Sequence, residues 1–405
     1  MHETKTPVRA WLITAVCFWM ALLAWGTVFY GNTVYLPALK AEHGWSTSLI
    51  GNAISLFFWL AIPVTLLFGW IADTFGTRLA VAYGGLAVGG GVAAMGWLQE
   101  PWQLYCAYAL LATGYPLLAT PAISASLVPW FGARLGLPLS LALTGASVGG
   151  AVSVPLMVAM SADYGFRATM TAIGLLVAAS MVPLALLVLR RPADARGQSI
   201  RGAETSFTLG NTMRTARFWR VALAGGLGYA SQVGYLSHQL AYLSETLTAA
   251  EASWAISLGV AAGAVGRLVT GWLSTRMPLA WLAAATYLTQ GLGIFIVVQA
   301  DATLALYLGS AVAGFVIGNI VMLPPLLLRQ AFGPAAYGKV YGFANIALYT
   351  GAGFGPGLAG WLRDGTGSYT GALMAFVAFH AVAAVMLLLP GMRHAPTKTS
   401  PKTNS

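Results

Sequence analysis

Long apolar runs, separated by short stretches of charged and turn residues, fill almost the whole chain. Charged residues make up only 8% of the sequence, whereas they make up roughly 25% of an ordinary soluble domain. A chain so poor in charge cannot cover a water-facing surface, so lipid must be its solvent. Since a helix needs roughly 20 apolar residues to cross a hydrocarbon core of about 30 Å, this length allows about a dozen spans. The sequence therefore predicts an all-α membrane protein.

The breaks between the runs predict twelve transmembrane helices in two pseudo-symmetric six-helix bundles. The N-terminal bundle comprises residues 1–189 and the C-terminal bundle residues 218–392, and the polar segment 190–217 between them is interpreted as a cytoplasmic linker. The tail 393–405 is rich in Pro, Thr, Ser and Lys, which is typical of a disordered segment. The expected spans are 11–38, 46–72, 79–98, 103–130, 136–160, 166–189, 218–243, 250–274, 279–299, 302–328, 337–362 and 369–391.

An internal repeat supports the division into two bundles. Three sets of matching residues occur in the same order in both halves, at a nearly constant separation of 202 to 204 residues. Parallel repeats of six helices are typical of transporters in which two bundles rock about a central site. The alternative to a repeat is chance similarity between spans that are both rich in Gly, Ala and Leu. The matches are Gly69-Trp70-Ile71-Ala72 with Gly271-Trp272-Leu273-Ser274, Ala53-Ile54-Ser55-Leu56 with Ala255-Ile256-Ser257-Leu258, and Gly114 and Pro121 with Gly318 and Pro325.

The net charge of +10 comes from Lys and Arg residues at the termini and at alternate ends of the expected spans. An excess of Lys and Arg marks the cytoplasmic loops of membrane proteins, so both termini are expected in the cytoplasm. The basic excess thus reflects topology, and we expect no nucleic-acid partner. The compact loops are typical of a bacterial inner (cytoplasmic) membrane. The intervening span ends carry Glu42, Glu100, Asp163, Glu245, Glu251 and Asp301.

Arg267 is the strongly charged residue that lies deepest in an expected span. It precedes Arg276, at the cytoplasmic end of the eighth span, by about 13.5 Å at ~1.5 Å per residue. A charge near the bilayer centre costs about 2.5–3.5 kcal/mol to insert, so it should face protein or water. No Asp or Glu lies within an expected membrane core, so we infer that the partner of Arg267 is the substrate, a carboxylate gripped by the guanidinium fork. An arginine that snorkels, or that helix-end carbonyls hold, is the alternative.

Further polar side chains at membrane depth are candidates to complete a substrate pocket. Each is alternatively an ordinary interhelical hydrogen-bonding group. The imidazole of His238 is singled out because it can carry a proton near neutral pH. The candidates are Tyr30 and Asn32 in the first span, Tyr115 in the fourth, Gln232, Tyr235, His238 and Gln239 in the seventh, Asn319 in the tenth, and Asn345 and Tyr349 in the eleventh.

The loop after the second span has the pattern Gly69-x-x-x-Asp73-x-x-Gly76-x-Arg78. Its glycines permit close helix packing and a tight turn, and its aspartate can cap or pair at a helix end. A charged pair that forms in one orientation and breaks in the other acts as a conformational latch. We interpret Gly69, Asp73, Gly76 and Arg78 as such a latch, with an ordinary charged loop as the alternative.

This loop resembles the loop motif of the major facilitator superfamily, although Thr74 and Thr77 stand where that motif usually has basic residues. Four further segments resemble the monocarboxylate transporter and oxalate/formate antiporter branch of that superfamily. They are Tyr35-Leu36-Pro37 through Gly44-Trp45-Ser46, the stretch from Trp130-Phe131 to Gly136, Arg214-Thr215-Ala216-Arg217-Phe218-Trp219, and Gly266-Arg267-Leu268.

The resemblance implies the major facilitator fold, with a substrate site between the two bundles. In that site Arg267 would bind a carboxylate, and polar residues near Tyr115 would contribute to the pocket. The chain departs from its relatives in three ways: Gly263 stands where the animal type has an acid, the first span has no lysine, and no second cation is evident between Tyr341 and Trp361. These departures argue against proton coupling by a lysine–acid pair and against a doubly charged substrate.

The leading hypothesis is a secondary active transporter of a small organic anion, a monocarboxylate such as a hydroxy or keto acid. It would work by alternating access with proton symport or anion exchange, because anion entry against an inside-negative potential costs about 2.3 kcal/mol per charge per 100 mV. Efflux of drug-like or neutral molecules and a non-transporting membrane sensor are the alternatives. No nucleotide loop, metal cluster or nucleophile–base pair is evident, so we expect no enzyme activity, cofactor or metal. The expected partners are the carboxylate, the lipid bilayer and, with symport, protons, and a monomer is expected.

Overall fold

The computed structural model describes residues 8–189, 212–332 and 337–389, and every regular element within them is helical. Most of the predicted linker and all of the predicted tail fall outside the described residues. The elements of the N-terminal half are α1 Val8–Leu23, η1 Ala24–Phe29, α2 Gly31–His43, α3 Thr47–Thr74, α4 Thr77–Met95, α5 Pro101–Gly114, η2 Tyr115–Leu117, α6 Thr120–Phe131, η3 Gly132–Arg134, α7 Gly136–Tyr164 and α8 Phe166–Leu187. Those of the C-terminal half are α10 Ala216–Leu243, α11 Ala249–Leu273, α12 Leu279–Gln299, α13 Thr303–Phe315, α14 Ile317–Phe332, α15 Tyr337–Thr366 and α16 Thr370–Leu388.

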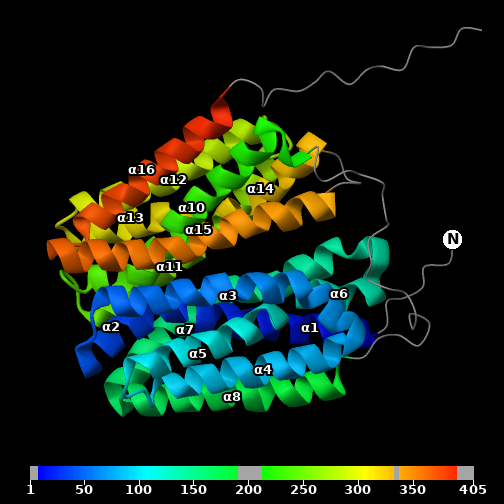
Figure 1. The fold of residues 1–405 in the computed structure, drawn as a ribbon, viewed down its shortest axis with the longest axis horizontal. Helices are drawn as coiled ribbons and strands as arrows, with labels where there is room; N and C mark the ends of the chain where they lie inside the picture. The colour runs from blue at the N-terminus through cyan, green and yellow to red at the C-terminus, as the bar shows by residue number, and fades with distance from the viewer. Residues whose placement is uncertain (1–7, 190–211, 333–336, 390–405) are drawn as a thin grey trace, which may run out of the picture.

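The described helices form twelve spans. Ten helical stretches are long and apolar enough to cross a membrane, and α10 and α15, with 28 and 30 residues, have the length but are less apolar. The first, fourth and tenth spans each consist of two helices in succession. Figure 1 shows the two halves side by side, with α3 of one against α15 of the other. The predicted all-α membrane fold with twelve spans is confirmed.

The internal repeat has a structural counterpart in the broken spans. The fourth span breaks after Gly114, where η2 separates α5 from α6, and the tenth breaks at Val316 between α13 and α14. The repeated tryptophans Trp70 and Trp272 lie near the matching ends of α3 and α11, with 60% and 57% of their surface exposed. Matching sequence positions therefore occupy equivalent places in the two halves.

The first span contains a π-helical turn, which the apolar pattern of the sequence does not predict. In η1 the backbone N–H of Tyr30 donates to the carbonyl of Trp25, five residues earlier, at 2.8 Å. A π turn inserts one extra residue into a helix and so re-aims the side chains around it, often at functional sites. Here it sets the directions of Phe29 and Tyr30 at the interface between the halves.

The two halves pack tightly where α3 begins and α15 ends, and we call this the closed end of the molecule. A Cβ atom added at Gly51 of α3 would lie 2.5 Å from the carbonyl oxygen of Pro356, and one at Gly360 of α15 would lie 2.6 Å from the Cα of Ser48. Only glycine allows backbones to approach so closely. Hydrogen bonds between the halves accompany this contact, among them one from the N–H of Gly357 to Ser55 Oγ at 3.0 Å.

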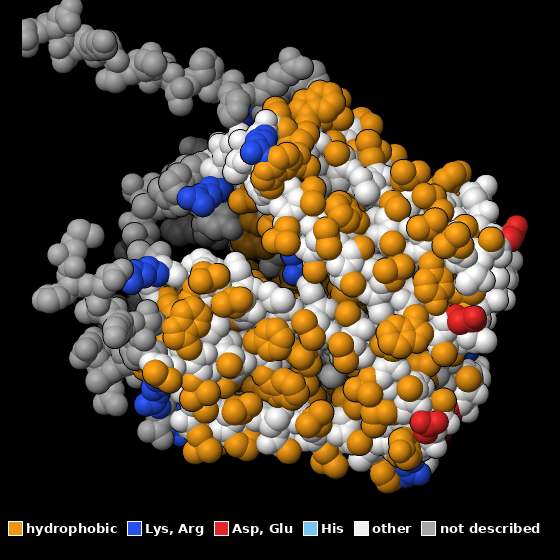
Figure 2. Space-filling view, turned by 180° about the vertical axis from the view of Figure 1, so that it is seen from behind, with side chains coloured by type: hydrophobic (Ala, Val, Ile, Leu, Met, Phe, Trp, Pro, Cys, Tyr) orange, Lys and Arg blue, Asp and Glu red, His pale blue; other side chains and the backbone are white. Residues whose placement is uncertain are grey.

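The opposite end, where α3 ends and α15 begins, is hollowed, and we call it the open end. Figure 2 shows the hollow between the two halves, with basic side chains around it and the acidic side chains at the far end. The charge asymmetry predicted from the sequence is therefore present in the fold. That the basic, open end faces the cytoplasm remains a prediction.

Candidate substrate-binding site

Arg267 lies in α11 with its side chain across the start of α14. A Cβ atom added at Gly318 would overlap the Arg267 Nε and lie 2.9 Å from its Cδ and Cγ. The one ion pair between described residues, Arg363 with Glu245, is at the closed end, so no described carboxylate lies within ion-pair distance of Arg267. The guanidinium is thus half-buried within the C-terminal half and has no acidic partner in the described part of the chain.

Asn319 braces the two helices that hold this arginine. Its Nδ2 donates to the carbonyl oxygen of Gly266 at 3.3 Å and to the hydroxyl of Thr270 at 2.7 Å. Asn319 was predicted as a pocket residue, and the structure places it fully buried, one residue after Gly318 and against α11. Its amide therefore fixes the geometry around Arg267.

Four tyrosines from four different spans lie close to one another, and one of them, Tyr30, lies near Arg267. Tyr30 comes from the first span, Tyr115 from the fourth, Tyr229 from the seventh and Tyr349 from the eleventh. Tyr115 and Tyr229 both lie near Tyr30 and Tyr349, and Tyr30 lies near Arg267. Among the described residues, the hydroxyls of Tyr30, Tyr115 and Tyr229 have no hydrogen-bond partner, and all three residues are buried. Among these three phenols, Tyr30 is therefore the one that lies near the guanidinium.

The rings of Phe29, Phe58, Tyr349 and Tyr229 form a closed loop that we call the aromatic collar. Its ring centroids are 6.3 Å apart for Phe29 and Phe58, 6.4 Å for Phe58 and Tyr349, 6.2 Å for Tyr349 and Tyr229, and 6.5 Å for Tyr229 and Phe29. Two rings belong to each half, so the collar spans the interface between the halves. The hydroxyl of Tyr349 also lies near that of Thr65 in α3.

Three candidates in the seventh span face their own half instead. The Nε2 of Gln239 donates to the hydroxyl of Ser310 in α13 at 3.3 Å, and the hydroxyl of Tyr235 is buried near the same serine with no hydrogen-bond partner among the described residues. The Nε2 of His238 lies 3.0 Å from the carbonyl oxygen of Pro356 in α15, so it is the protonated nitrogen of the imidazole. The structure does not bring these side chains to the arginine.

Tyr229 was not among the residues predicted from the sequence, although the spacing along α10 contained a signal for it. Tyr229 lies three residues before the candidate Gln232 and eleven before Leu240, which places all three on one helix face. That face meets the other half, because the backbone N–H of Leu240 donates to the hydroxyl of Thr33 at 3.3 Å. Gln232 is buried, and its Oε1 has no partner among the described residues.

The remaining candidates form no hydrogen bond with the four tyrosines. The Oδ1 of Asn32 accepts a hydrogen bond from the hydroxyl of Tyr108 at 3.0 Å, which ties the first span to α5. Asn345 is partly buried in α15, eleven residues before Pro356 and one turn before Tyr349. No cluster of three or more metal-ligating side chains occurs in the described residues.

The predicted latch lies at the open end. Gly76 adopts φ +82°, a conformation that favours glycine, at the turn between α3 and α4, and Gly69 has open space beside it. Asp73 and Arg78 are both exposed and form no ion pair with any described residue. The structure thus presents these residues unpaired at the hollowed end, and their role as a latch remains a prediction.

Comparison with known proteins agrees with this architecture. The chain matches the Major Facilitator Superfamily over residues 14–242 and 235–404. It is 27% identical to monocarboxylate transporter 13 of Rattus norvegicus, over 96% of this chain and 91% of the relative. It is 24% identical to the oxalate:formate antiporter of Oxalobacter formigenes, over 90% of this chain and 88% of the relative.

Solved structures share the fold at lower identity. A bacterial homologue of the human lysosomal transporter Spinster, in an inward-facing and occupied conformation, has a TM-score of 0.76 at 14% identity, over 97% of this chain and all of that one. The nucleoside transporter NupG has a TM-score of 0.77 at 14% identity, over 94% of this chain and 98% of that one. With its twelve spans and its match along nearly the whole sequence, this chain belongs to the Major Facilitator Superfamily, a family of membrane transporters and not of enzymes.

Proposed function

We propose that this protein transports a small organic anion, a monocarboxylate such as a hydroxy or keto acid, by alternating access. The observation that carries the proposal is Arg267, a half-buried guanidinium with no acidic partner in the described part of the chain. A fixed cation at this depth is costly unless it is paired. A substrate carboxylate supplies that pair in the bidentate geometry that guanidinium favours.

The tyrosine cluster supports the same proposal. Tyr30 offers a hydroxyl donor near Arg267, and Tyr115 and Tyr229 lie near Tyr30. Hydroxyl donors suit both a carboxylate and the adjacent oxygen of a hydroxy or keto acid. Two kinds of relative, the monocarboxylate transporters and the oxalate:formate antiporter, have names that refer to carboxylate substrates. The cluster takes side chains from both halves, so a ligand held there would respond to their relative movement.

The coupling is proposed to be proton symport or anion exchange. All acidic residues of the described chain lie at helix ends, so none is placed to carry a proton at the depth of Arg267. A proton could then travel with the substrate, or a second anion could leave as the first enters. Either route offsets the cost of about 2.3 kcal/mol per 100 mV for moving one negative charge.

Counterflow in proteoliposomes tests the proposal without assuming a driving force. Wild type should exchange a labelled monocarboxylate, and Arg267→Ala should abolish exchange while its melting temperature in detergent stays unchanged. The matched control is Arg276→Ala in the turn that follows α11, because Arg276 is exposed and stacks on Trp272 at 3.8 Å. Retained exchange in Arg267→Ala would overturn the assignment of the site, and an imposed pH gradient then separates symport from exchange.

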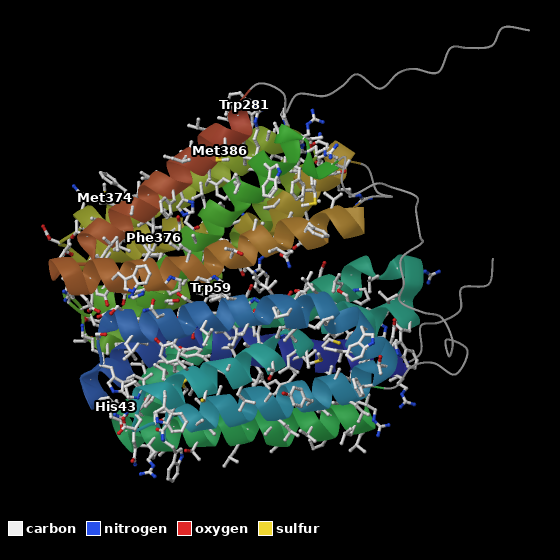
Figure 3. All side chains as sticks on the ribbon, in the orientation of Figure 1. His43, Trp59, Trp281, Met374, Phe376 and Met386 are labelled. Atoms are coloured by element: carbon white, nitrogen blue, oxygen red, sulfur yellow. The ribbon has the colours of Figure 1, made fainter. Side chains whose placement is uncertain are left out.

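Efflux of neutral or drug-like molecules is the second candidate, and an apolar groove favours it. The groove has a volume of about 550 Å³ and lies between α10 and α15, with Phe379 of α16 and Trp59 of α3 at its edges. The label in Figure 3 places Trp59 between the halves, where its indole N–H donates to the carbonyl oxygen of Thr350 at 3.2 Å. Transport that ignores substrate charge and survives Arg267→Ala would favour this candidate.

A further inference from the structure

The apolar groove between α10 and α15 runs along the flank of the C-terminal half. Its floor is the close contact of the two helices, because a Cβ atom added at Gly226 would lie 2.9 Å from the carbonyl oxygen of Ala347. Among the described residues that line the groove, Thr350 alone carries a hydroxyl. The rims are exposed apolar side chains, which are Trp219 and Leu223 of α10 and Phe343 and Phe354 of α15.

The groove has about the depth of one lipid leaflet. Its lining extends from Phe218 to Ala230 on α10 and from Phe343 to Phe354 on α15, and both helices begin at the open end. These stretches rise by about 16–18 Å at ~1.5 Å per residue. Half of a hydrocarbon core of about 30 Å is about 15 Å. The groove can therefore hold one extended acyl chain from the leaflet at the open end.

The inner end of the groove is closed by a residue of the other half. Trp59 lies in the middle of α3 and donates its indole N–H to the carbonyl oxygen of Thr350 at 3.2 Å. A Cβ atom added at Gly353 would overlap this indole, so the contact with α15 is close. A ligand can shift an equilibrium between conformations only if it binds them with different affinities. An occupant that touches Trp59 would favour the conformations in which α3 and α15 keep this contact.

The outer end of the groove is basic. Arg214, Arg217 and Arg220 lie at the start of α10, at the open end. Arg220 precedes Leu223 by three residues and Leu227 by seven, so it shares the helix face that lines the groove. Side chains in a helix lean toward its N-terminus, so that of Arg220 is directed toward the membrane surface.

An aromatic residue marks the membrane surface at the same place. The indole N–H of Trp219 donates to the carbonyl oxygen of Met213 at 2.7 Å, which holds the ring beside the residue that precedes Arg214. Tryptophan is enriched where the membrane meets water. The described carboxylates of the C-terminal half all lie at the closed end. The mouth of the groove is therefore suited to a negatively charged head group.

We propose that this groove binds one acyl chain of an anionic phospholipid, with the phosphate of the head group at Arg214 and Arg220. Lipid is the solvent of this flank, so an apolar groove of leaflet depth is filled from the bilayer. Each Lys or Arg near the membrane surface favours an anionic lipid by about fivefold. A neutral drug-like molecule would use the apolar walls but not the two arginines.

Native mass spectrometry of the delipidated, full-length protein tests the head-group contact. Phosphatidylglycerol should bind at least about fivefold more tightly than phosphatidylcholine with the same acyl chains. Arg214→Gln and Arg220→Gln should each lower the affinity for phosphatidylglycerol about fivefold and leave that for phosphatidylcholine unchanged. The matched control is Arg276→Gln, which removes the same charge at the open end between α11 and α12, two helices that contribute no residue to the groove.

A bulky side chain in the groove tests the site of the acyl chain. Ala347 is half-buried in the middle of the lining, so Ala347→Phe should fill the groove and remove the tightly bound phosphatidylglycerol. Ala381→Phe is the matched control, because Ala381 is exposed on α16 and lies outside the groove. The melting temperature in detergent shows that each variant is folded.

Each other outcome would overturn this inference. Equal affinities for the two lipids would remove the role of the arginines, and a loss of preference in Arg276→Gln equal to that in Arg220→Gln would assign the preference to the general charge of the open end. Phosphatidylglycerol that stays tightly bound to folded Ala347→Phe would place the chain elsewhere. Carboxylate exchange through Arg267 is a separate measurement, since neither α11 nor α14 lines the groove.

Discussion

The carboxylate of Asp364 in α15 accepts a hydrogen bond from the backbone N–H of Ser48 in α3 at 2.7 Å and so joins the two halves at the closed end. It also accepts one from the N–H of Thr47 at 3.2 Å. The next free donor of α3, the N–H of Leu49, bonds to the hydroxyl of its own N-cap, Ser46, at 3.2 Å. The first N–H groups of a helix have no partner within it, so part of the cap of α3 comes from the opposite half.

Replacing Asp364 by alanine should favour opening of the closed end. Removing a helix cap costs about 0.5–2 kcal/mol, and the exposure of this carboxylate points to the lower part of that range. We expect roughly a fivefold shift of population toward separation of α3 from α15. Spin labels measure the separation of the two halves at this end. They are attached at Ala41→Cys in α2 and Thr366→Cys in α15, in a background with Cys17→Ala and Cys106→Ser.

Glu245→Ala is the control for this prediction. Glu245 forms an exposed ion pair with Arg363 at 3.1 Å, and both residues belong to the C-terminal half. Its loss should leave the distance between α3 and α15 unchanged. An equal opening in both variants would mean that the charge of the region, and not the cap from Asp364, holds the end closed.

The same contact predicts a pH dependence. Partial burial raises the pKa of the Asp364 carboxyl, but hydrogen bonds from Ser48 and Thr47 outweigh it and hold the pKa below the ordinary value of 3.8. A group whose pKa is lowered in the closed state stabilises that state above its ordinary pKa, and the stabilisation is lost as the pH falls through the lowered pKa. The closed end should therefore be equally populated between about pH 5 and about pH 8 and should open below about pH 4.

Spin-label distances against pH check this, with Asp364→Asn as the comparison. The asparagine variant keeps an acceptor oxygen but cannot titrate, so its acid transition should disappear. Lys40 also lies at this contact, since its Nζ donates a hydrogen bond to the hydroxyl of Thr47 at 3.0 Å. A transition of the wild type centred near neutral pH would assign the switch to another group.

Gly360 should be needed for the closed end to form at all. A Cβ atom there would lie 2.6 Å from the Cα of Ser48 and 2.7 Å from the carbonyl oxygen of Thr47. Both are backbone atoms, so α3 and α15 must separate, and overpacking of this kind costs about 1–3 kcal/mol. Gly360→Ala should shift the labelled distance toward the open state, whereas Gly365→Ala, with open space beside it in the same helix, should not. Unchanged distances in Gly360→Ala would contradict the proposed packing role.

The large-scale architecture followed from the sequence because its cause is local. Each span needs only a run of apolar residues, and the position of Arg267 within its span follows from the rise of a helix. The repeat of Gly69 and Gly271 indicated which ends correspond, and the fold places both at matching helix ends. These properties depend on residues near one another in the chain.

The pairing of side chains between spans did not follow from the sequence. Tyr229 was missed and His238 was favoured, because the polar character of α10 does not reveal which of its faces meets the other half. Asp364 was not singled out either, since its partners Thr47 and Ser48 are more than 300 residues away in the chain. The π turn before Tyr30 depends on packing around the first span, which a single sequence does not report.

Gly318→Ala should weaken substrate binding by displacing Arg267. The added methyl group would occupy the place of the Arg267 Nε and press on its Cδ and Cγ, so the side chain must swing away from the tyrosine cluster. A displacement of about 1 Å in a binding group can cost up to ~100-fold. We expect KM for a carboxylate to rise about 10- to 100-fold with the maximal rate less affected. Gly271→Ala, in the same α11 as Arg267 and with open space beside it, should leave KM unchanged.

A double-mutant cycle shows whether Gly318 acts through the arginine. Substitutions at residues in contact are not additive, and the coupling between them is the measure of their interaction. Gly318→Ala should therefore have no further effect on carboxylate binding, measured as a shift in melting temperature, once Arg267 is already alanine. If the two effects add, Gly318 supports the break between α13 and α14 in its own right. If Gly318→Ala has no further effect in the Arg267→Ala background, Gly318 is identified as the residue whose missing side chain leaves room for Arg267.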